Sequence, residues 1–142
     1  MPYIVQADLL SQLSNAQLIQ LTDDNKTGSV DADKVTRAIV EAEAEVNGYI
    51  ATKYAVPLAA PVPDLVKQLA IDVAIYRLYR RRQRVPDDVR TAYEDAVNKL
   101  EGIAKGLVTL GIDPPPAESS SATSGQVFGP ERVFNRDKLS GF

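Results

Sequence analysis

The strongest constraint on the fold is an almost continuously apolar segment that lies between two prolines. Residues 69–78 (LAIDVAIYRL) are apolar nearly all round a helix, apart from two charged side chains. Pro63 suits the first turn of a helix, and Pro86 ends any helix that precedes it. The segment predicts a helix from residue 63 to about residue 84. It is either the central helix of a bundle or is also buried by a neighbouring subunit.

The flanking sequence predicts further helices. An apolar stripe at steps of three and four residues runs over residues 31–54. A second stripe starts at residue 86 and ends at a glycine, at position 106 or 111. Two short helices are expected before them, over residues 7–13 and 16–21. The fold class is therefore all-α: a small helical bundle of about four main helices plus short N-terminal helices.

Composition divides the chain into three parts. Residues 1–111 are the helical bundle, and residues 112–125 are a Pro- and Ser-rich linker. Residues 126–142 regain apolar content and hold all three phenylalanines of the chain. Because a disordered tail is normally poor in aromatic residues, this last part is predicted to be a C-terminal arm that docks on another surface.

The chain contains no cysteine and no histidine. Thiolate nucleophiles, Ser-His-Asp triads, imidazole acid–base catalysis and zinc-finger sites are therefore excluded. No paired carboxylates or nucleophile constellation stand out among the other residue types. We expect no catalytic residue, no metal ligand and no cofactor, and hence no enzyme.

The start of the chain has no visible secretory signal. The longest strongly apolar stretch is far shorter than the roughly 20 residues that span a bilayer. We expect a protein that is made in the cytoplasm and acts without a membrane.

A polar segment before residue 31 resembles a calcium loop in its spacing. Counted from Asp23, oxygen ligands stand at positions 1, 3, 5 and 9, and Gly28 stands at position 6. Position 12, which should be a bidentate glutamate, is Lys34. The favoured interpretation is a polar turn, in which Gly28 has a positive φ and Asp31 caps the next helix.

Basic residues concentrate in the middle of an acidic protein. The net charge is −3, yet residues 65–105 hold nine Lys and Arg against six Asp and Glu. The cluster has three interpretations: cations at a helix C-terminus, a contact with an acidic protein surface, or phosphate binding to DNA. Its members are Arg77, Arg80, Arg81, Arg82 and Arg84, with Arg90 shortly after.

Asp72 lies within the apolar segment and is predicted to be a structural buried polar residue. A buried carboxylate must be paired or hydrogen-bonded. Arg77 lies on a different helix face, so the partner is expected on another helix or the N-terminal segment, with help from Tyr76.

The order of these elements resembles the phage Mu-type family of head–tail connector (adaptor or neck) proteins, which occur in tailed phages and prophages. The resemblance covers almost the whole chain. Its most specific parts are GYIATKYAVPL, the YRLYR helix followed by PDDVR, and the C-terminal RVFNRDKLSGF.

This resemblance implies a non-catalytic structural protein of the virion neck. Such proteins are helical bundles that form a ring, usually a dodecamer, beneath the portal protein and join the capsid to the tail. The implied partners are other copies of the chain, the portal and a tail, stopper or terminator protein. Genomic DNA would pass through the channel without sequence-specific binding.

The resemblance also assigns roles to the residues. The arginines at positions 77, 80, 81, 82 and 84 would contact a subunit or the portal. Docking through the C-terminal arm would involve Val127, Phe128, Arg132, Val133, Phe134, Arg136, Asp137, Leu139 and Phe142.

Two alternatives remain open at this point. One is a cytoplasmic helical protein-interaction adaptor unrelated to phages, which would be a monomer or dimer without affinity for a portal. The other is a DNA-binding module that uses the cluster from Arg77 to Arg90, with an affinity that falls steeply with salt.

Removal of residues 126–142 is expected to leave the bundle folded and to abolish assembly, because the arm contributes contacts to neighbours and not to the core. Circular dichroism and a binding assay on the truncated chain check this. Loss of helical signal in the truncated chain would instead make the arm part of the core.

Overall fold

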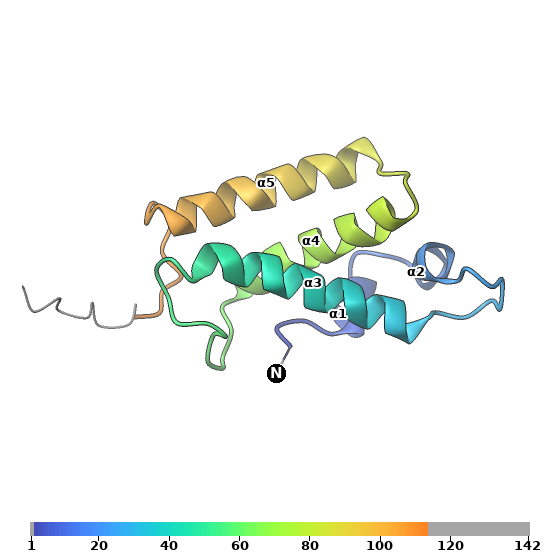
Figure 1. Cartoon of the computed structure of the whole chain (residues 1–142), viewed down its shortest axis with the longest axis horizontal. Coiled ribbons are helices and arrows are strands. Elements are labelled where there is room, and N and C mark those ends of the chain that lie inside the picture. Colours follow the sequence, from blue (N-terminus) through green and yellow to red (C-terminus); the bar gives the residue numbers. More distant parts are fainter. Residues whose placement is uncertain (1, 114–142) are drawn as a thin grey trace, which may run out of the picture.

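A computed structural model describes residues 2–113, which form helices connected by turns and contain no strand. The all-α prediction is confirmed, and the two short N-terminal helices are present as expected, but the described residues form three long helices where about four were expected. The helices are α1 (Gln6–Leu10), α2 (Asn15–Thr22), α3 (Ala32–Ile50), α4 (Asp64–Arg81) and α5 (Asp87–Ala104) (Figure 1).

Helix starts follow the predicted signals closely. Ser14 caps α2 by accepting a hydrogen bond from the backbone N–H of Gln17, whose side chain binds the Ser14 backbone in return. Pro63 and Pro86 directly precede α4 and α5. These residues suit helix starts because a proline lacks the N–H that a first turn leaves unpaired anyway.

Helix ends are less well predicted. The first short helix stops at Leu10, before the expected residue 13, and the Ser11 hydroxyl donates to the Asp8 carbonyl there. The helix expected over residues 31–54 ends at Ile50, and residues 51–53 form a turn. After α5 the chain turns at Gly106, whose φ of +76° favours glycine.

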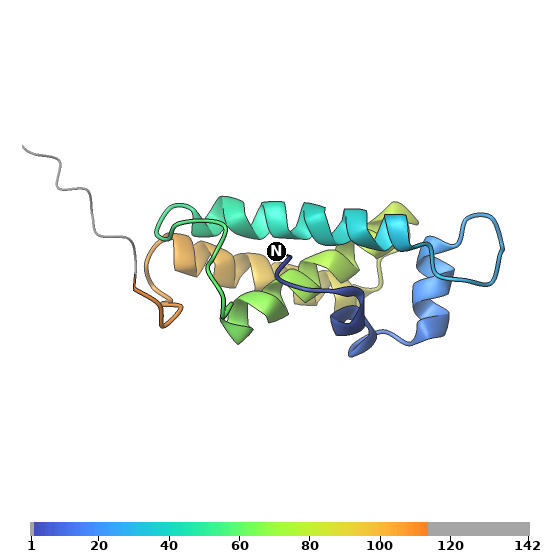
Figure 2. The same ribbon diagram turned by 90° about the horizontal axis from the view of Figure 1, so that it is seen from below.

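The three long helices pack against one another, and α1 and α2 pack against α4 (Figures 1 and 2). In Figure 1, α5 runs along the upper edge, whereas α1 and α2 lie below with the N-terminal segment. Helix α4 therefore packs against every other helix.

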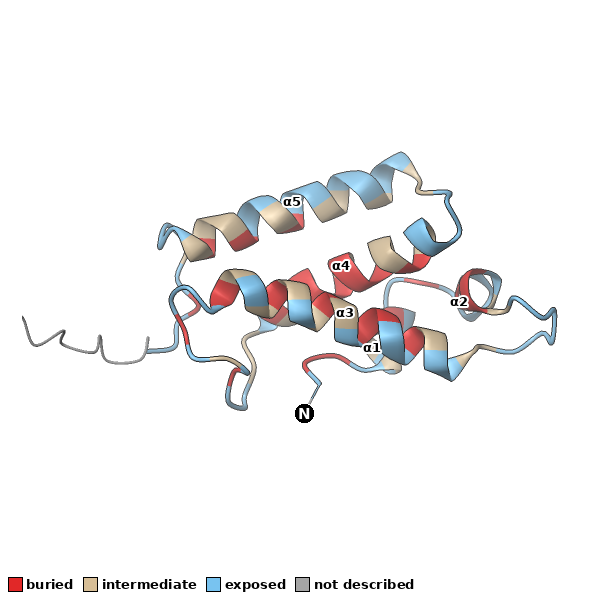
Figure 3. Ribbon diagram, in the orientation of Figure 1, coloured by how far each residue is buried: buried red, intermediate tan, exposed pale blue. Residues whose placement is uncertain are grey.

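Burial follows from this central place. The buried side chains of α4 cover most of its circumference, except for the face that carries Gln68 and Asp72. They are Val66, Leu69, Ala70, Ile71, Val73, Ala74, Ile75 and Leu78. By contrast, α5 is buried only along the edge that faces the other helices (Figure 3). The apolar segment is thus covered within one chain, and no neighbouring subunit is needed to bury it.

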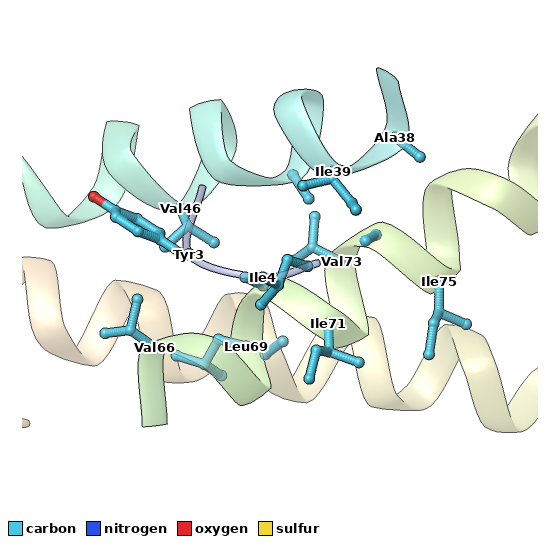
Figure 4. Packing of buried hydrophobic residues seen from close by; sticks show 14 of the residues in the cluster. Tyr3, Ile4, Ala38, Ile39, Val46, Val66, Leu69, Ile71, Val73 and Ile75 are labelled. Carbon is cyan, nitrogen blue, oxygen red and sulfur yellow. The ribbon is translucent and has the colours of Figure 1, made fainter. Parts of the chain in front are cut away.

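The N-terminal segment is fixed to the bundle by one tyrosine. Tyr3 and Ile4 lie across α3 and α4 (Figure 4). The Tyr3 hydroxyl donates to Asn47 Oδ1 at 2.6 Å and accepts from the backbone N–H of Leu58 at 2.7 Å. Glu43 accepts hydrogen bonds from the Tyr3 and Ile4 backbone. One buried side chain therefore joins the chain start, α3 and the α3–α4 connection.

Within residues 2–113, no helix is both long and apolar enough to cross a bilayer. The predicted docking arm, residues 126–142, lies outside the described residues, as does most of the predicted linker.

Substitution Leu100→Ala should lower the free energy of unfolding by about 2–5 kcal/mol, because the side chain is fully buried where α5 meets the core. Leu107→Ala is the matched control: Leu107 is 80% exposed, so its loss should change stability by less than about 0.5 kcal/mol. Urea denaturation followed by circular dichroism measures both. Equal effects would contradict the assigned burial of α5.

Candidate functional site

Arg77 joins α4 to α3 through two carboxylates. Its Nη2 atom lies 2.6 Å from Glu45 Oε2, and its Nη1 atom lies 3.2 Å from Glu41 Oε2. Glu41 and Glu45 are one helical turn apart, so both reach the same side of α3. The contacts are partly buried, which makes them less screened than surface pairs. Arg77 therefore links α3 and α4 through its ion pairs.

The same cluster extends to α5. The Tyr93 hydroxyl donates to Glu45 Oε1 at 2.7 Å, and its ring stacks on Tyr76 with centroids 3.9 Å apart. Burial and the hydrogen bond to Glu45 raise the pKa of Tyr93 to about 12. The hydroxyl therefore keeps its proton and acts as a donor at neutral pH.

The end of α4 binds the loop between α2 and α3. Arg81 Nη1 lies 2.7 Å from Asp24 Oδ2, and Arg82 Nη1 lies 2.9 Å from Asp24 Oδ1. Arg82 also donates to the Asp23 carbonyl. These two arginines thus pair with an acidic loop of their own chain.

The ammonium group of Lys34 pairs with two carboxylates of the same α2–α3 region. Its Nζ atom lies 2.8 Å from both Asp24 Oδ2 and Asp31 Oδ2, and it donates to the Thr22 carbonyl at 3.0 Å. Oxygen atoms of Thr22, at the end of α2, and of Asp24 and Asp31 therefore surround the ammonium group. No group of three or more His, Cys, Asp or Glu in residues 2–113 could hold a metal ion.

The polar-turn interpretation of this loop is confirmed. The Asp23 carboxylate accepts from the backbone N–H groups of Thr27 and Gly28, and Gly28 has a φ of +77°. Asp31 caps α3 by accepting from the backbone N–H groups of Asp33 and Lys34.

The ion pairs change the titration of the acidic groups. Hydrogen bonds from Arg81 and then Lys34 hold the pKa of Asp24 well below its ordinary value. The hydrogen bond from Lys34 also lowers the pKa of Asp31. In turn, Asp24 and Asp31 raise the pKa of Lys34. All of these groups are charged at neutral pH.

A basic groove lies between α3 and α4, with a volume of about 590 Å³. One carboxylate, that of Glu41, stands among five cations. Its pKa is lowered, chiefly by the hydrogen bond from Arg37, so it does not act as a general acid at neutral pH. The groove can attract anionic groups by charge and hydrogen bonding. The lining residues are Lys34, Arg37, Ala38, Glu41, Arg77, Leu78, Arg80 and Arg81.

The structure thus divides the predicted arginine cluster. Arg77, Arg81 and Arg82 form ion pairs within the chain. Arg80 and Arg84 are exposed and form no ion pair with any residue between positions 2 and 113. Of these two, only Arg80 lines the groove.

Asp72 is half-buried, which corrects the expectation of a buried carboxylate. Gln68, one turn earlier on α4, donates to Asp72 Oδ1 at 3.1 Å. The pKa of Asp72 is raised by burial, an effect that the hydrogen bond from Gln68 and the charge of Lys99 on α5 partly offset. Among the described residues, the hydrogen-bond partner of Asp72 thus lies on α4 itself and not on another element, and Tyr76 stacks on Tyr93 instead of assisting.

Sequence reasoning missed the acidic partners of the arginines. Glu41 and Glu45, with Arg37 one turn before Glu41, carry a usable signal, because such spacing places charges on one helix face. Asp24 carries no comparable signal, since its partner Arg81 is 57 residues away along the chain. The predicted docking side chains of the C-terminal arm lie outside the described residues.

Asp24→Asn should destabilise the chain at pH 7, with a difference from wild type that shrinks below about pH 4. The folded-state pKa of Asp24 is lowered from 3.8, so its stabilisation is present above that value and lost as the pH falls. Thermal unfolding across this pH range measures the effect. Asp95→Asn, at an exposed carboxylate outside the ion pairs, is the control. A pH-independent deficit in Asp24→Asn would contradict the assignment.

Comparison with known proteins places the chain among phage sequences. Residues 3–128 match the family described as Bacteriophage Mu, Gp36. The "Mu-like prophage FluMu protein gp36" of Haemophilus influenzae is 28% identical over 114 residues, which are 80% of this chain and 79% of that protein. "Gene product J" of Escherichia phage Mu is 28% identical over 144 residues, which cover all of this chain and 99% of that protein. Since the family match covers most of its length, the chain belongs to the Bacteriophage Mu Gp36 family of phage proteins.

Proposed function

We propose that the chain is a head–tail connector subunit, a structural protein of the virion neck that forms a ring beneath the portal and joins the capsid to the tail. The observation that carries the proposal is the family match over residues 3–128. The motifs described above resemble Mu-type neck proteins, and that resemblance implies this role.

The geometry of the bundle supports a structural role. Several of its charged side chains hold helices and loops together, as Arg77 does between α3 and α4. Such a network keeps an exposed surface in a fixed shape, which a subunit of a symmetric assembly requires. The described part of the chain offers a basic groove and no catalytic constellation, so we propose a non-enzymatic function without a cofactor.

The proposed contact residues are fewer than the sequence indicated. Arg77, Arg81 and Arg82 act inside the chain by fixing α4 to α3 and to the α2–α3 loop. Arg80 and Arg84 remain for contact with another subunit or the portal. The C-terminal arm, residues 126–142, is proposed to dock on a neighbouring copy, the portal or a tail, stopper or terminator protein.

The DNA-binding alternative is less well supported. Three arginines of the cluster already bind carboxylates of their own chain, so fewer of its cations are available to release counterions from phosphates. The chain is also acidic overall. Genomic DNA is therefore proposed to pass through the ring without sequence-specific binding.

A purified portal ring from the same phage, mixed with the full chain and imaged by electron microscopy, tests the proposal. We expect a stoichiometric ring of this chain on the portal. Arg84→Glu should weaken that binding, whereas Lys67→Glu, a charge reversal at the other end of α4, should not. Absence of binding between two folded partners at micromolar concentration would favour the interaction-adaptor alternative.

A further inference from the structure

Helix α5 carries an acidic stripe, formed by Asp87, Asp88, Glu94 and Asp95. Asp87 and Glu94 are two helical turns apart, as are Asp88 and Asp95, so each pair shares a side of the helix. All four are exposed. Asp87 and Glu94 lie opposite the buried side of α5, whereas Asp88 and Asp95 lie on its flank, where Asp88 lines a hollow beside α4. None of them forms an ion pair with a residue in the described part of the chain. The stripe has a net negative charge, with four carboxylates unpaired within residues 2–113 beside two exposed cations of the same helix, Arg90 and Lys99.

The basic groove has an excess of positive charge, because two of the carboxylates around it each pair with more than one cation. Asp24 pairs with three cations, and Glu41 pairs with both Arg37 and Arg77. Around the groove, six cations meet four carboxylates. The cations are Lys34, Arg37, Arg77, Arg80, Arg81 and Arg82, and the carboxylates are Asp24, Asp31, Glu41 and Glu45.

The excess charge is accessible at two positions. Arg80 is exposed and pairs with none of residues 2–113. The Arg37 side chain is 82% exposed and makes only a one-turn pair with Glu41, which is a weak interaction on a helix surface. Both can turn toward an incoming carboxylate without breaking the contacts that hold α3 and α4 together.

We propose that these two surfaces bind each other between copies of this chain, with the acidic stripe of one copy in the basic groove of the next. The proposal rests on the proposed ring function and names the surfaces that would build the ring. It assigns Arg37 and Arg80 as the groove side of the contact.

Charge also sets the symmetry of this contact. Two acidic stripes repel each other, and so do two basic grooves, so a self-complementary contact through either surface is unfavourable. The complementary pairing is heterologous, with a different surface on each partner. Heterologous contacts form closed rings when the rotation between neighbours closes.

The favoured occupant of the groove is a second copy and not a nucleic acid. A duplex attracted to the groove would be repelled by the stripe and would leave the stripe unpaired. A second copy satisfies both surfaces at once. Arginine suits this contact because its guanidinium can bind a carboxylate through two parallel hydrogen bonds.

A charge-swap experiment tests the pairing. One variant carries Glu94→Lys and Asp95→Lys, which makes the stripe basic, and the other carries Arg37→Glu and Arg80→Glu, which makes the groove acidic. Each variant alone should self-associate at least about tenfold more weakly than wild type. An equal mixture should regain association, because each stripe then meets a groove of opposite charge.

Sedimentation velocity on the full chains, at up to about 1 mM protein and at about 50 and 500 mM salt, measures association. Wild-type association should weaken at the higher salt. Circular dichroism verifies that each variant is folded, and Asp64→Lys with Lys67→Glu is the control, since it reverses two exposed charges at the start of α4. A monomeric wild type, variants that associate like wild type, or a mixture without recovery would each overturn the proposal.

The portal assay distinguishes failure of the stripe–groove contact from failure of the proposed neck function. If each variant alone still forms a full ring on the portal, the stripe–groove contact is overturned while the neck function stands. If the mixture recovers association but no form of the chain binds the portal, the contact stands and the neck function fails.

Discussion

The apolar surface of α4 is the feature on which the rest of the molecule depends, because every other helix is placed by covering part of it. Burial of such a surface is the main favourable term in folding. It is non-directional, however, and does not by itself fix how α3 and α5 are rotated about α4. That specificity comes from the polar cluster of Arg77, Glu45 and Tyr93, which links all three long helices by directional hydrogen bonds.

The same division between general burial and specific polar contacts recurs at the ends of the bundle. Tyr3 fixes the start of the chain through its hydroxyl, and Tyr54 accepts a hydrogen bond from the Leu110 backbone after α5. Both rings are buried while their oxygen atoms are satisfied. The chain therefore uses tyrosines where an apolar body and a polar anchor are needed at one position.

Local chemistry explains what could be predicted from the sequence. Pro63, Pro86 and the Ser14 cap act on their immediate neighbours, so they predicted helix starts well. The roles of Arg77 and Arg81 could not be predicted in this way, because their partners lie on elements that only the tertiary fold brings near. A cluster of arginines looks the same in a sequence whether its side chains pair with carboxylates of the same chain or bind another molecule. In the structure Arg77, Arg81 and Arg82 form ion pairs within the chain. Arg80, Arg84 and Arg90 are exposed and form none with the other described residues.

Because of Lys34, the conformation of the α2–α3 loop does not depend on a metal ion taken up from solution. In a metal-binding loop, the ordering cation arrives by diffusion, and its occupancy follows the ionic composition of the compartment. Here the positive charge is covalently attached and lies against Asp24 and Asp31 whenever the chain is folded. The loop can therefore be completed during synthesis, and it keeps its shape in the presence of chelators. The contact therefore does not change with the divalent ions of the medium.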